Sequence, residues 1–323
     1  MKKIGVFTSG GDSPGMNACI RAVVRTATYN KVEVYGIYRG YEGMIDNEIT
    51  QLNAHDVSNI IQRGGTILKS ARSPRFMEKK HRETAYNNLK KNGIEGVVAI
   101  GGDGTFTGAK VFSNEFDVKF TGAPGTIDND LYGTDSTIGY DTAMNNVMQA
   151  VDKIRDTADS HDRLFFIEVM GRDAGFIALR SGISVGAEAI LIPETQTYID
   201  KLFDKLESGW RKNKKSNIII VAEGDDSGGA MAIAEKVKKK YPHLDTKVSI
   251  LGHIQRGGSP TVYDRVLASH LGNHAVRALM EGKHNVMAGM IHKQVELTSF
   301  EQAIKHHKGI NEELLNLAEV LSS

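Results

Sequence analysis

The chain has 323 residues, of which 40% are hydrophobic and 24% charged, the composition of an ordinary soluble globular protein. Its formal net charge is +1, so the charge balance favours neither nucleic acid nor a membrane surface as a partner. The first apolar run ends at Thr8, too soon for a signal peptide, and no run approaches the roughly 18 apolar residues that cross a bilayer, so we expect a cytoplasmic protein.

Short apolar segments alternate with amphipathic segments along almost the whole chain, and a chain of this length usually contains two domains. Apolar runs rich in Val and Ile suit strands that are buried on both faces of a sheet. We predict strands at 4–8, 32–38, 97–100, 118–121, 164–169, 189–192, 217–222 and 247–251. We predict helices at 16–29, 77–92, 142–159, 199–212 and 231–240. This alternation predicts an α/β fold in which helices cover parallel sheets.

Polar loops that contain glycine follow six of the predicted strands. They lie at residues 8–15, 101–105, 124–130, 170–175, 222–224 and 252–258. Ligands of open α/β sheets bind at the edge where the parallel strands end. We therefore expect the six loops to form one large site.

Two of these loops, around Gly11 and Gly104, are candidates for phosphate binding. Glycine lets the backbone approach a ligand closely, and the following helix points free N–H groups at an anion. Neither loop is a Walker A motif or a GxGxxG pattern, and either one alone reads equally well as a tight turn. Their occurrence in one chain, together with a carboxylate, favours a nucleotide.

Carboxylates in two of the loops suit a kinase. Asp103 is a candidate ligand of Mg²⁺, which phosphoryl-transfer sites hold through one or two carboxylates, and it could also cap the following helix. Asp128, in Thr-Ile-Asp-Asn-Asp, is a candidate base for an attacking hydroxyl. Taken alone, such a segment is more often a solvated turn, but its occurrence with Asp103 favours catalysis.

Arginines in or beside the loops supply positive charge for more than one phosphate, because a guanidinium group binds phosphate bidentately. The arginines in or beside the loops are Arg163, Arg172 and Arg256, and a fourth, Arg72, lies in the segment 69–75. His253 is a further candidate donor, although a lone histidine is more often a satisfied core residue.

Five segments, in order along nearly the whole chain, resemble the motifs of bacterial ATP-dependent 6-phosphofructokinases. The segments are 8–12, 101–105, 124–130, 170–172 and 252–260. The resemblance implies two Rossmann-like domains, each a mostly parallel sheet covered by helices. Residues 1–139 with about 255–305 would form the ATP-binding domain, and 140–254 with about 306–323 the fructose 6-phosphate-binding domain. The family is homotetrameric, with sites shared between subunits.

The implied reaction is transfer of a phosphoryl group from ATP, with Mg²⁺, to the 1-hydroxyl of fructose 6-phosphate in glycolysis. Asp128 would be the general base, Thr126 and Arg172 would steady the transferring group, and Asp103 would hold Mg²⁺. The implied ATP-binding residues are Gly11, Arg72, Ser73, Gly102, Asp103, Gly104 and Thr105. The implied sugar-phosphate residues are Thr126, Ile127, Asp128, Arg163, Met170, Gly171, Arg172, Glu223, Lys247, His253, Ile254, Gln255 and Arg256. Of these, Arg163 and Lys247 would reach the 6-phosphate across a subunit boundary.

The family also has an effector pocket, for ADP or phosphoenolpyruvate. Its implied residues are Arg21, Arg25, Arg155, Gly186, Glu188, Lys212, Lys214 and Lys215, of which the lysines alone would read as a solvated loop. Three positions depart from the family: Lys247 replaces an arginine, and Ala54 and Asn59 replace an arginine and an aspartate of the effector interface. We expect catalysis to survive these changes and the effector response to be weak.

Three other functions compete with this interpretation. Pyrophosphate-dependent phosphofructokinases tend to have Asp and Lys where this chain has Gly104 and Gly125, and glycine at both positions leaves room for ATP. NAD and lipid kinases share the Gly-Gly-Asp-Gly loop but lack the segments at 126–130 and 252–258. A non-catalytic sugar-phosphate sensor would have no need to keep Asp103, Asp128 and Arg172.

Overall fold

The computed structural model describes residues 1–160, 163–211, 218–306 and 308–322. The chain divides into two compact units. Unit 1 contains Met1–Ile127, Leu131–Thr142 and Arg256–Lys308, and unit 2 contains Asp128–Asp130, Ala143–Gln255 and Gly309–Ser323. The assignment of one ligand to each domain stays a prediction. None of the helices in the described ranges is long and apolar enough to span a bilayer.

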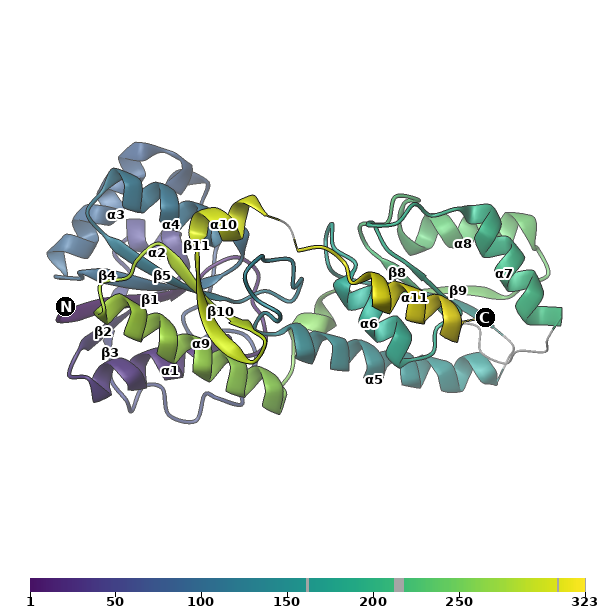
Figure 1. Ribbon diagram of the computed structural model, residues 1–323, viewed down its shortest axis with the longest axis horizontal. Helices are drawn as coiled ribbons and strands as arrows, with labels where there is room; N and C mark the ends of the chain where they lie inside the picture. The colour runs from purple at the N-terminus through teal and green to yellow at the C-terminus, as the bar shows by residue number, and fades with distance from the viewer. Residues whose placement is uncertain (161–162, 212–217, 307, 323) are drawn as a thin grey trace. The chain divides into compact units, whose positions relative to one another are not determined.

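Unit 1 is built on a seven-stranded, mostly parallel sheet in the order β11-β10-β5-β4-β1-β2-β3 (Figure 1). Its strands are β1 (Lys3–Thr8), β2 (Glu33–Ile37), β3 (Ile49–Leu52), β4 (Gly96–Gly101), β5 (Lys119–Pro124), β10 (Val286–Ile291) and β11 (Gln294–Ser299). Only the two edge strands, β3 and β11, run antiparallel to their neighbours. The five strands between them therefore all end at one edge.

Helices cover both faces of this sheet (Figure 1). One face carries α1 (Met16–Tyr29) and α9 (Val262–Met280). The other carries α2 (Gly40–Ile45), α3 (Lys79–Lys91), α4 (Asp103–Glu115) and α10 (Phe300–Lys305), with a short 3-10 turn at Pro74–Met77. Val98 packs towards the first face and Val97 towards the second, which explains why the central strands are continuously apolar.

The close approach of α1 and α9 depends on a small residue. A Cβ at Gly272 of α9 would lie 2.9 Å from the backbone oxygen of Cys19 on α1. Cys19 itself is fully buried in this contact and is part of the core.

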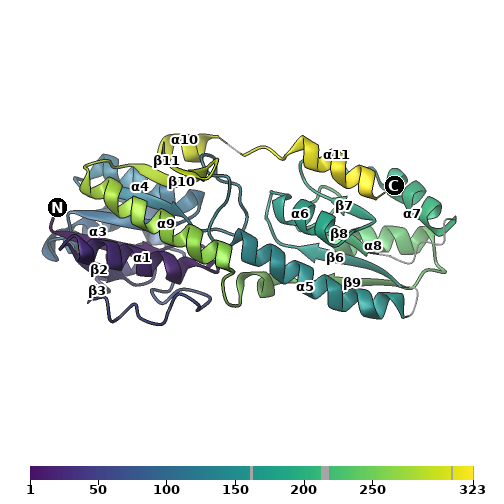
Figure 2. The ribbon, with the colours of Figure 1, turned by 60° about the horizontal axis from the view of Figure 1, so that its bottom comes forward.

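Unit 2 is built on a four-stranded parallel sheet in the order β7-β8-β6-β9. Its strands are β6 (Leu164–Val169), β7 (Ala189–Leu191), β8 (Ile218–Ala222) and β9 (Thr246–Ile250). Its helices are α5 (Tyr140–Asp159), α6 (Phe176–Ser184), α7 (Ile199–Arg211), α8 (Gly229–Lys240) and α11 (Glu312–Leu321). α5 belongs to this unit from Ala143 onward, and a 3-10 turn covers Gly252–Arg256. α7 and α8 pack on one face, and α6 packs against β7 and β8 from the other (Figure 2).

The expected α/β fold of mostly parallel sheets covered by helices is confirmed. Each predicted strand and helix is present to within two residues at either end, except that β5 continues three residues beyond its predicted end, to Pro124. Lys212 and Asn217, at the ends of two predicted elements, lie outside the described residues.

Candidate active site

The six glycine-bearing loops follow the carboxyl ends of strands in both sheets. The loops after β1, β4 and β5 belong to unit 1, except that Asp128–Asp130 are counted with unit 2. The loops after β6, β8 and β9 belong to unit 2, up to Gln255. The six loops therefore arise from two separate sheets, and the expectation that they form one large site stays a prediction.

The loop after β1 is shaped by an arginine that is distant in the sequence. Nη1 of Arg256 donates to the backbone oxygen of Asp12 at 3.0 Å. A Cβ at Gly11 would lie 2.6 Å from that same nitrogen, so a larger residue there would move the guanidinium group from this position. Arg256, which was predicted with the sugar-phosphate residues, is thus seated in unit 1 against this loop.

The segment that contains Arg72 and Ser73 is held by Glu42 of α2. The Ser73 hydroxyl donates to the Glu42 carboxylate, and Nε of Arg75 donates to it at 2.8 Å. These hydrogen bonds lower the pKa of Glu42, and the one from Ser73 has the largest effect. Arg72 is exposed. Sequence analysis missed Glu42, whose partners are about 30 residues away and therefore give no local signal.

The loop after β4 leads directly into α4, which begins at Asp103 with Gly102 as its N-cap residue. Asp103 therefore does not cap the helix, and its side chain is exposed at the first turn. Nothing lies within 4 Å of the position that a Cβ at Gly104 would occupy. The start of α4 is thus open, with backbone N–H groups and one carboxylate at its end.

The loop after β5 is packed tightly against the loop after β4. The backbone N–H of Gly125 donates to the oxygen of Gly101 at 3.0 Å. A Cβ at Gly125 would lie 3.0 Å from Cγ2 of Ile100, so a larger residue would displace its neighbours. Thr126 lies beside Gly102, with its Cβ 3.8 Å from the position that a Cβ at Gly102 would take.

Asp128 is buried, with 3% of its surface exposed, and it lies beside Arg172. Nε of Arg172 is 3.7 Å from Oδ2 of Asp128, while the arginine side chain itself is 59% exposed. Arg172 has a φ of 52°, a left-handed conformation that is uncommon for a residue other than glycine. A buried carboxylate and an exposed, backbone-constrained guanidinium group thus lie together at the end of β6.

Glu223 and Gln255 hold the backbone around Arg172. Oε1 of Glu223 accepts hydrogen bonds from the N–H of Arg172 at 2.7 Å and of Gly171 at 3.3 Å. Oε1 of Gln255 accepts one from Met170 at 3.2 Å. His253 is exposed, so the alternative of a core histidine is wrong, and Ile254 is 59% exposed.

Arg163 and Lys247 lie at the opposite edge of the same sheet. Arg163 precedes β6, Lys247 is the second residue of β9, and the two strands run parallel. Nζ of Lys247 is 2.6 Å from Oδ1 of Asp245, and Nε of Arg163 is 2.9 Å from Oδ2 of the same carboxylate. Both contacts lower the pKa of Asp245, and the one with Lys247 has the larger effect. These two cations are therefore separated from the Arg172 loop by the length of a strand.

The predicted effector residues fall into two groups. Arg21 and Arg25 are one helical turn apart on α1 of unit 1, where burial and the charge of Arg25 lower the pKa of Arg21. Arg155, Gly186 and Glu188 lie in unit 2, where Arg155 donates to the backbone oxygen of Val185. Lys212, Lys214 and Lys215 lie outside the described residues.

A further carboxylate, Asp264, organises the start of α5. It is fully buried and accepts hydrogen bonds from the N–H groups of Gly139 at 2.9 Å and Thr142 at 2.8 Å, and from the Thr142 hydroxyl. Burial is the main cause that raises the pKa of Asp264, to about 6. The Thr-x-x-Asp spacing of Thr261 and Asp264 predicts a cap for α9, the helix that contains Asp264. It does not predict that Asp264 also binds the start of α5.

Comparison with known proteins gives a consistent result. The family model described as phosphofructokinase matches residues 3–279. ATP-dependent 6-phosphofructokinase 2 of Bacteroides thetaiotaomicron is 56% identical over 322 residues, covering 100% of this chain and 99% of its own. ATP-dependent 6-phosphofructokinase of Cytophaga hutchinsonii is 58% identical over 322 residues, covering 100% of this chain and 98% of its own.

Solved structures show the same fold. The structure of phosphofructokinase from Saccharomyces cerevisiae matches with a TM-score of 0.90 and 36% identity. The match covers 100% of this chain and 47% of the longer yeast chain. A pyrophosphate-dependent phosphofructokinase from Marinobacter aquaeolei matches with a TM-score of 0.85 at 21% identity, over 100% of this chain and 92% of that one. The second likeness concerns the fold alone.

Proposed function

Because this chain belongs to the phosphofructokinase family, we propose that it transfers the γ-phosphoryl group of ATP to the 1-hydroxyl of fructose 6-phosphate, giving fructose 1,6-bisphosphate and ADP. The observation that carries the proposal is the buried carboxylate of Asp128 with Arg172 Nε 3.7 Å away, in segments that match the family. The full-length relatives named ATP-dependent 6-phosphofructokinase support the choice of substrates. The reaction belongs to glycolysis, and we propose that the enzyme acts in the cytoplasm.

In this proposal Asp128 accepts the proton of the sugar hydroxyl as that oxygen attacks the γ-phosphorus. A carboxylate is a suitable base because the proton leaves as the O–P bond forms. Arg172 and Thr126 steady the negative charge of the transferring group, for which an exposed guanidinium group held by a fixed backbone is well suited. Glu223 acts mainly by holding that backbone, through its hydrogen bonds to Gly171 and Arg172.

ATP would bind along the carboxyl edge of the sheet in unit 1. The open N-terminus of α4 offers backbone N–H groups at Gly102, Asp103 and Gly104, and the loop at Gly11 offers a close approach to phosphate. Arg72 and Ser73 would bind the remainder of the nucleotide from the segment that Glu42 holds. The space beside Gly104 supports ATP over pyrophosphate as donor, and a lysine at Gly125, as in the pyrophosphate-dependent enzymes, would have to displace the side chains of Ile100 and Met16.

The residues present fit Mg²⁺. Within the described ranges no cluster of three or more His, Cys, Asp or Glu side chains could enclose a metal ion. Asp103, exposed at the end of the proposed phosphate site, is the single carboxylate that Mg²⁺ needs when phosphates and water supply its other ligands. When bound there, Mg²⁺ would neutralise charge on the phosphates.

The sugar-phosphate site would be shared between subunits of a homotetramer. β6 has six residues, about 20 Å at the usual rise per residue. Arg163 and Lys247 at one end of the sheet and the Arg172 loop at the other therefore cannot contact the same small sugar phosphate. We propose that Arg163 and Lys247 bind the 6-phosphate held by the neighbouring subunit, while Met170, Gly171, Glu223, His253 and Arg256 serve the subunit's own site.

The effector pocket would also be shared, with Arg21 and Arg25 from one subunit and Arg155, Gly186 and Glu188 from another. ADP and phosphoenolpyruvate are the anions proposed for it. Ala54 has no side-chain group to hydrogen-bond across such an interface, so little binding energy would couple to a change of subunit arrangement.

A coupled assay of fructose 1,6-bisphosphate formation tests the proposed function. The purified protein should use ATP with fructose 6-phosphate and should show less than about a hundredth of that rate with pyrophosphate, a difference of about 2.7 kcal/mol. Equal rates with both donors would contradict the steric reasoning at Gly104. No turnover with either donor would favour a non-catalytic sugar-phosphate-binding protein.

A further inference from the structure

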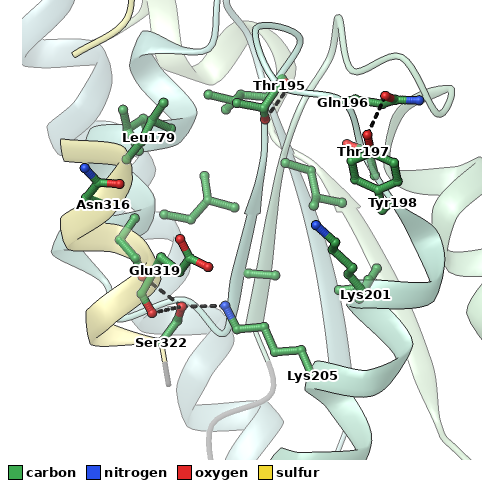
Figure 3. A pocket seen from close by; sticks show the side chains of 17 residues that line it. Leu179, Thr195, Gln196, Thr197, Tyr198, Lys201, Lys205, Asn316, Glu319 and Ser322 are labelled. Atoms are coloured by element: carbon green, nitrogen blue, oxygen red, sulfur yellow. Dashed lines mark hydrogen bonds between the residues drawn. The ribbon is translucent and has the colours of Figure 1, made fainter. Parts of the chain in front are cut away.

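Unit 2 contains a groove that no part of the proposed reaction uses. It has a volume of about 790 Å³ and lies among α6, β7, α7 and α11 (Figure 3). This volume is within the range of sites that hold small organic ligands. The residues assigned to catalysis, to substrates and to the effector pocket are absent from its lining.

The floor of the groove is apolar because β7 is an edge strand. In the sheet order β7 has a neighbour, β8, on one side only. Ile190 packs towards α6, where it would meet a Cβ at Gly182, and Leu191 packs with the cluster on the α7 side. Both side chains are only half-buried, and Leu315 and Ala318 of α11 add further half-buried apolar surface. Apolar side chains thus remain partly open to a ligand on both sides of the edge strand.

One wall of the groove carries two cations. Lys201 and Lys205 extend from α7 into the groove (Figure 3). Nζ of Lys201 lies 4.7 Å from the centre of the Tyr198 ring, and within the described part of the chain no carboxylate is within ion-pair distance of it. Nζ of Lys205 donates to the Ser322 hydroxyl at 2.5 Å, which keeps this second amine inside the groove.

The facing wall carries one anion, Glu319 of α11 (Figure 3). The charged side chains of the lining are thus two lysines and one glutamate. An anionic group would be attracted to the lysine wall, at Lys201 above all, and an apolar body fits the floor formed by β7 and α11. A group of this kind would also give α11 the contacts it lacks, since none of its ten residues is buried.

We propose that this groove binds a small amphiphilic carboxylate, with its anionic group at Lys201 and Lys205 and its apolar body on Ile190, Leu191 and Leu315. The proposal does not depend on the reaction proposed above. Sodium octanoate is the probe, with octan-1-ol as the uncharged analogue of the same length. Titration calorimetry in the presence of fructose 6-phosphate keeps the probe away from the proposed sugar-phosphate site.

Octanoate should bind about threefold to tenfold more tightly than octan-1-ol, because a partly exposed ion pair changes an affinity by a factor of this size. Lys201→Met should weaken octanoate by a similar factor, and the double variant Lys201→Met, Lys205→Met by more. Glu319→Gln should tighten it, because a repelling charge is removed. Lys238→Met on α8 is the matched control and should leave the affinity unchanged. Octanoate should also slow amide hydrogen exchange in 312–321, and a bulky Ala318→Trp side chain should abolish both effects.

Equal affinity for octanoate and octan-1-ol would overturn the proposal, since the lysines would then recognise nothing. So would an unchanged affinity in the double lysine variant, or protection that appears elsewhere and not in α11. Thermal unfolding of each variant shows that it is folded before its affinity is interpreted.

Discussion

At the scale of single residues, the proposed chemistry depends on the environment of Asp128. Its carboxylate is buried, yet it lies beside the exposed cation of Arg172. The surrounding backbone is held by Glu223, whose only local signal in the sequence is a glycine that follows it. Residue identity therefore indicates candidates for the reacting groups, but not the groups that keep them in place.

Asp128→Asn keeps the size of the side chain and removes the proton acceptor. We expect kcat to fall by about 10²–10⁴, with little change in the KM for ATP, because a general base acts in the chemical step. Asp173→Asn, which alters an exposed carboxylate next to Arg172, is the control and should keep most of the activity. If the Asp128→Asn enzyme retained more than about a tenth of kcat, Asp128 would not be the base.

Gly104→Asp tests the space proposed for the nucleotide. The new carboxylate would stand where nothing lies within 4 Å, and it would repel the phosphates of ATP. We expect the KM for ATP to rise roughly tenfold or more, about 1.4 kcal/mol, with little change in the KM for fructose 6-phosphate. Gly104→Ala separates volume from charge and should have a smaller effect. A rise confined to the sugar phosphate would show that the nucleotide lies elsewhere.

At the scale of helices and strands, the amount that sequence can predict depends on local signals. Apolar runs rich in Val and Ile correctly predicted the positions of the central strands of both sheets. The hairpin of β10 and β11 was not predicted, because its two-residue turn, His292–Lys293, has positive φ at both positions without the Asn or Gly that usually signals it. The boundary within 124–142 was also placed only roughly, since the chain crosses between units there without a linker.

The buried carboxylate of Asp264, which accepts hydrogen bonds at the start of α5, makes the stability of the fold depend on pH. The pKa of Asp264 is about 6 in the folded protein, against an ordinary value of 3.8, so between about pH 4 and pH 6 the folded state binds a proton that the unfolded state has lost. The contribution of Asp264 to stability is therefore greatest below pH 4 and falls as pH rises to 6, by about 3 kcal/mol over that range.

Asp264→Asn removes this titration. We expect the difference in unfolding free energy between the wild type and the variant to shrink as pH rises from 4 to 6 and to stay constant above that, measured by urea denaturation at one protein concentration. Asp117→Asn, an exposed carboxylate in unit 1, is the matched control and should show a much smaller change. A difference that grew with pH would mean that the hydrogen bonds from Gly139 and Thr142 outweigh burial.

At the scale of the whole molecule, the proposed sites need more than one chain. Subunits with Asp128→Asn lack the base, and subunits with Lys247→Ala and Arg163→Ala lack the phosphate ligands, so each should be nearly inactive alone. Mixed tetramers should regain activity, because some shared sites then pair an intact Asp128 with intact Arg163 and Lys247. Hybrids shown by mass spectrometry to have exchanged subunits, but without activity, would indicate that each site is built within one chain.

The position of Arg163 and Lys247 at the far edge of the sheet has a consequence for the enzyme at low concentration. If a subunit alone holds only part of each sugar-phosphate site, dissociation and loss of activity are the same event. Specific activity should then fall on dilution, and it should fall more slowly when fructose 6-phosphate is present, because each bound sugar bridges two chains and resists their separation. ATP alone, held within unit 1, should protect far less. An activity per milligram that stays constant down to concentrations where light scattering detects only monomers would show that one chain is sufficient.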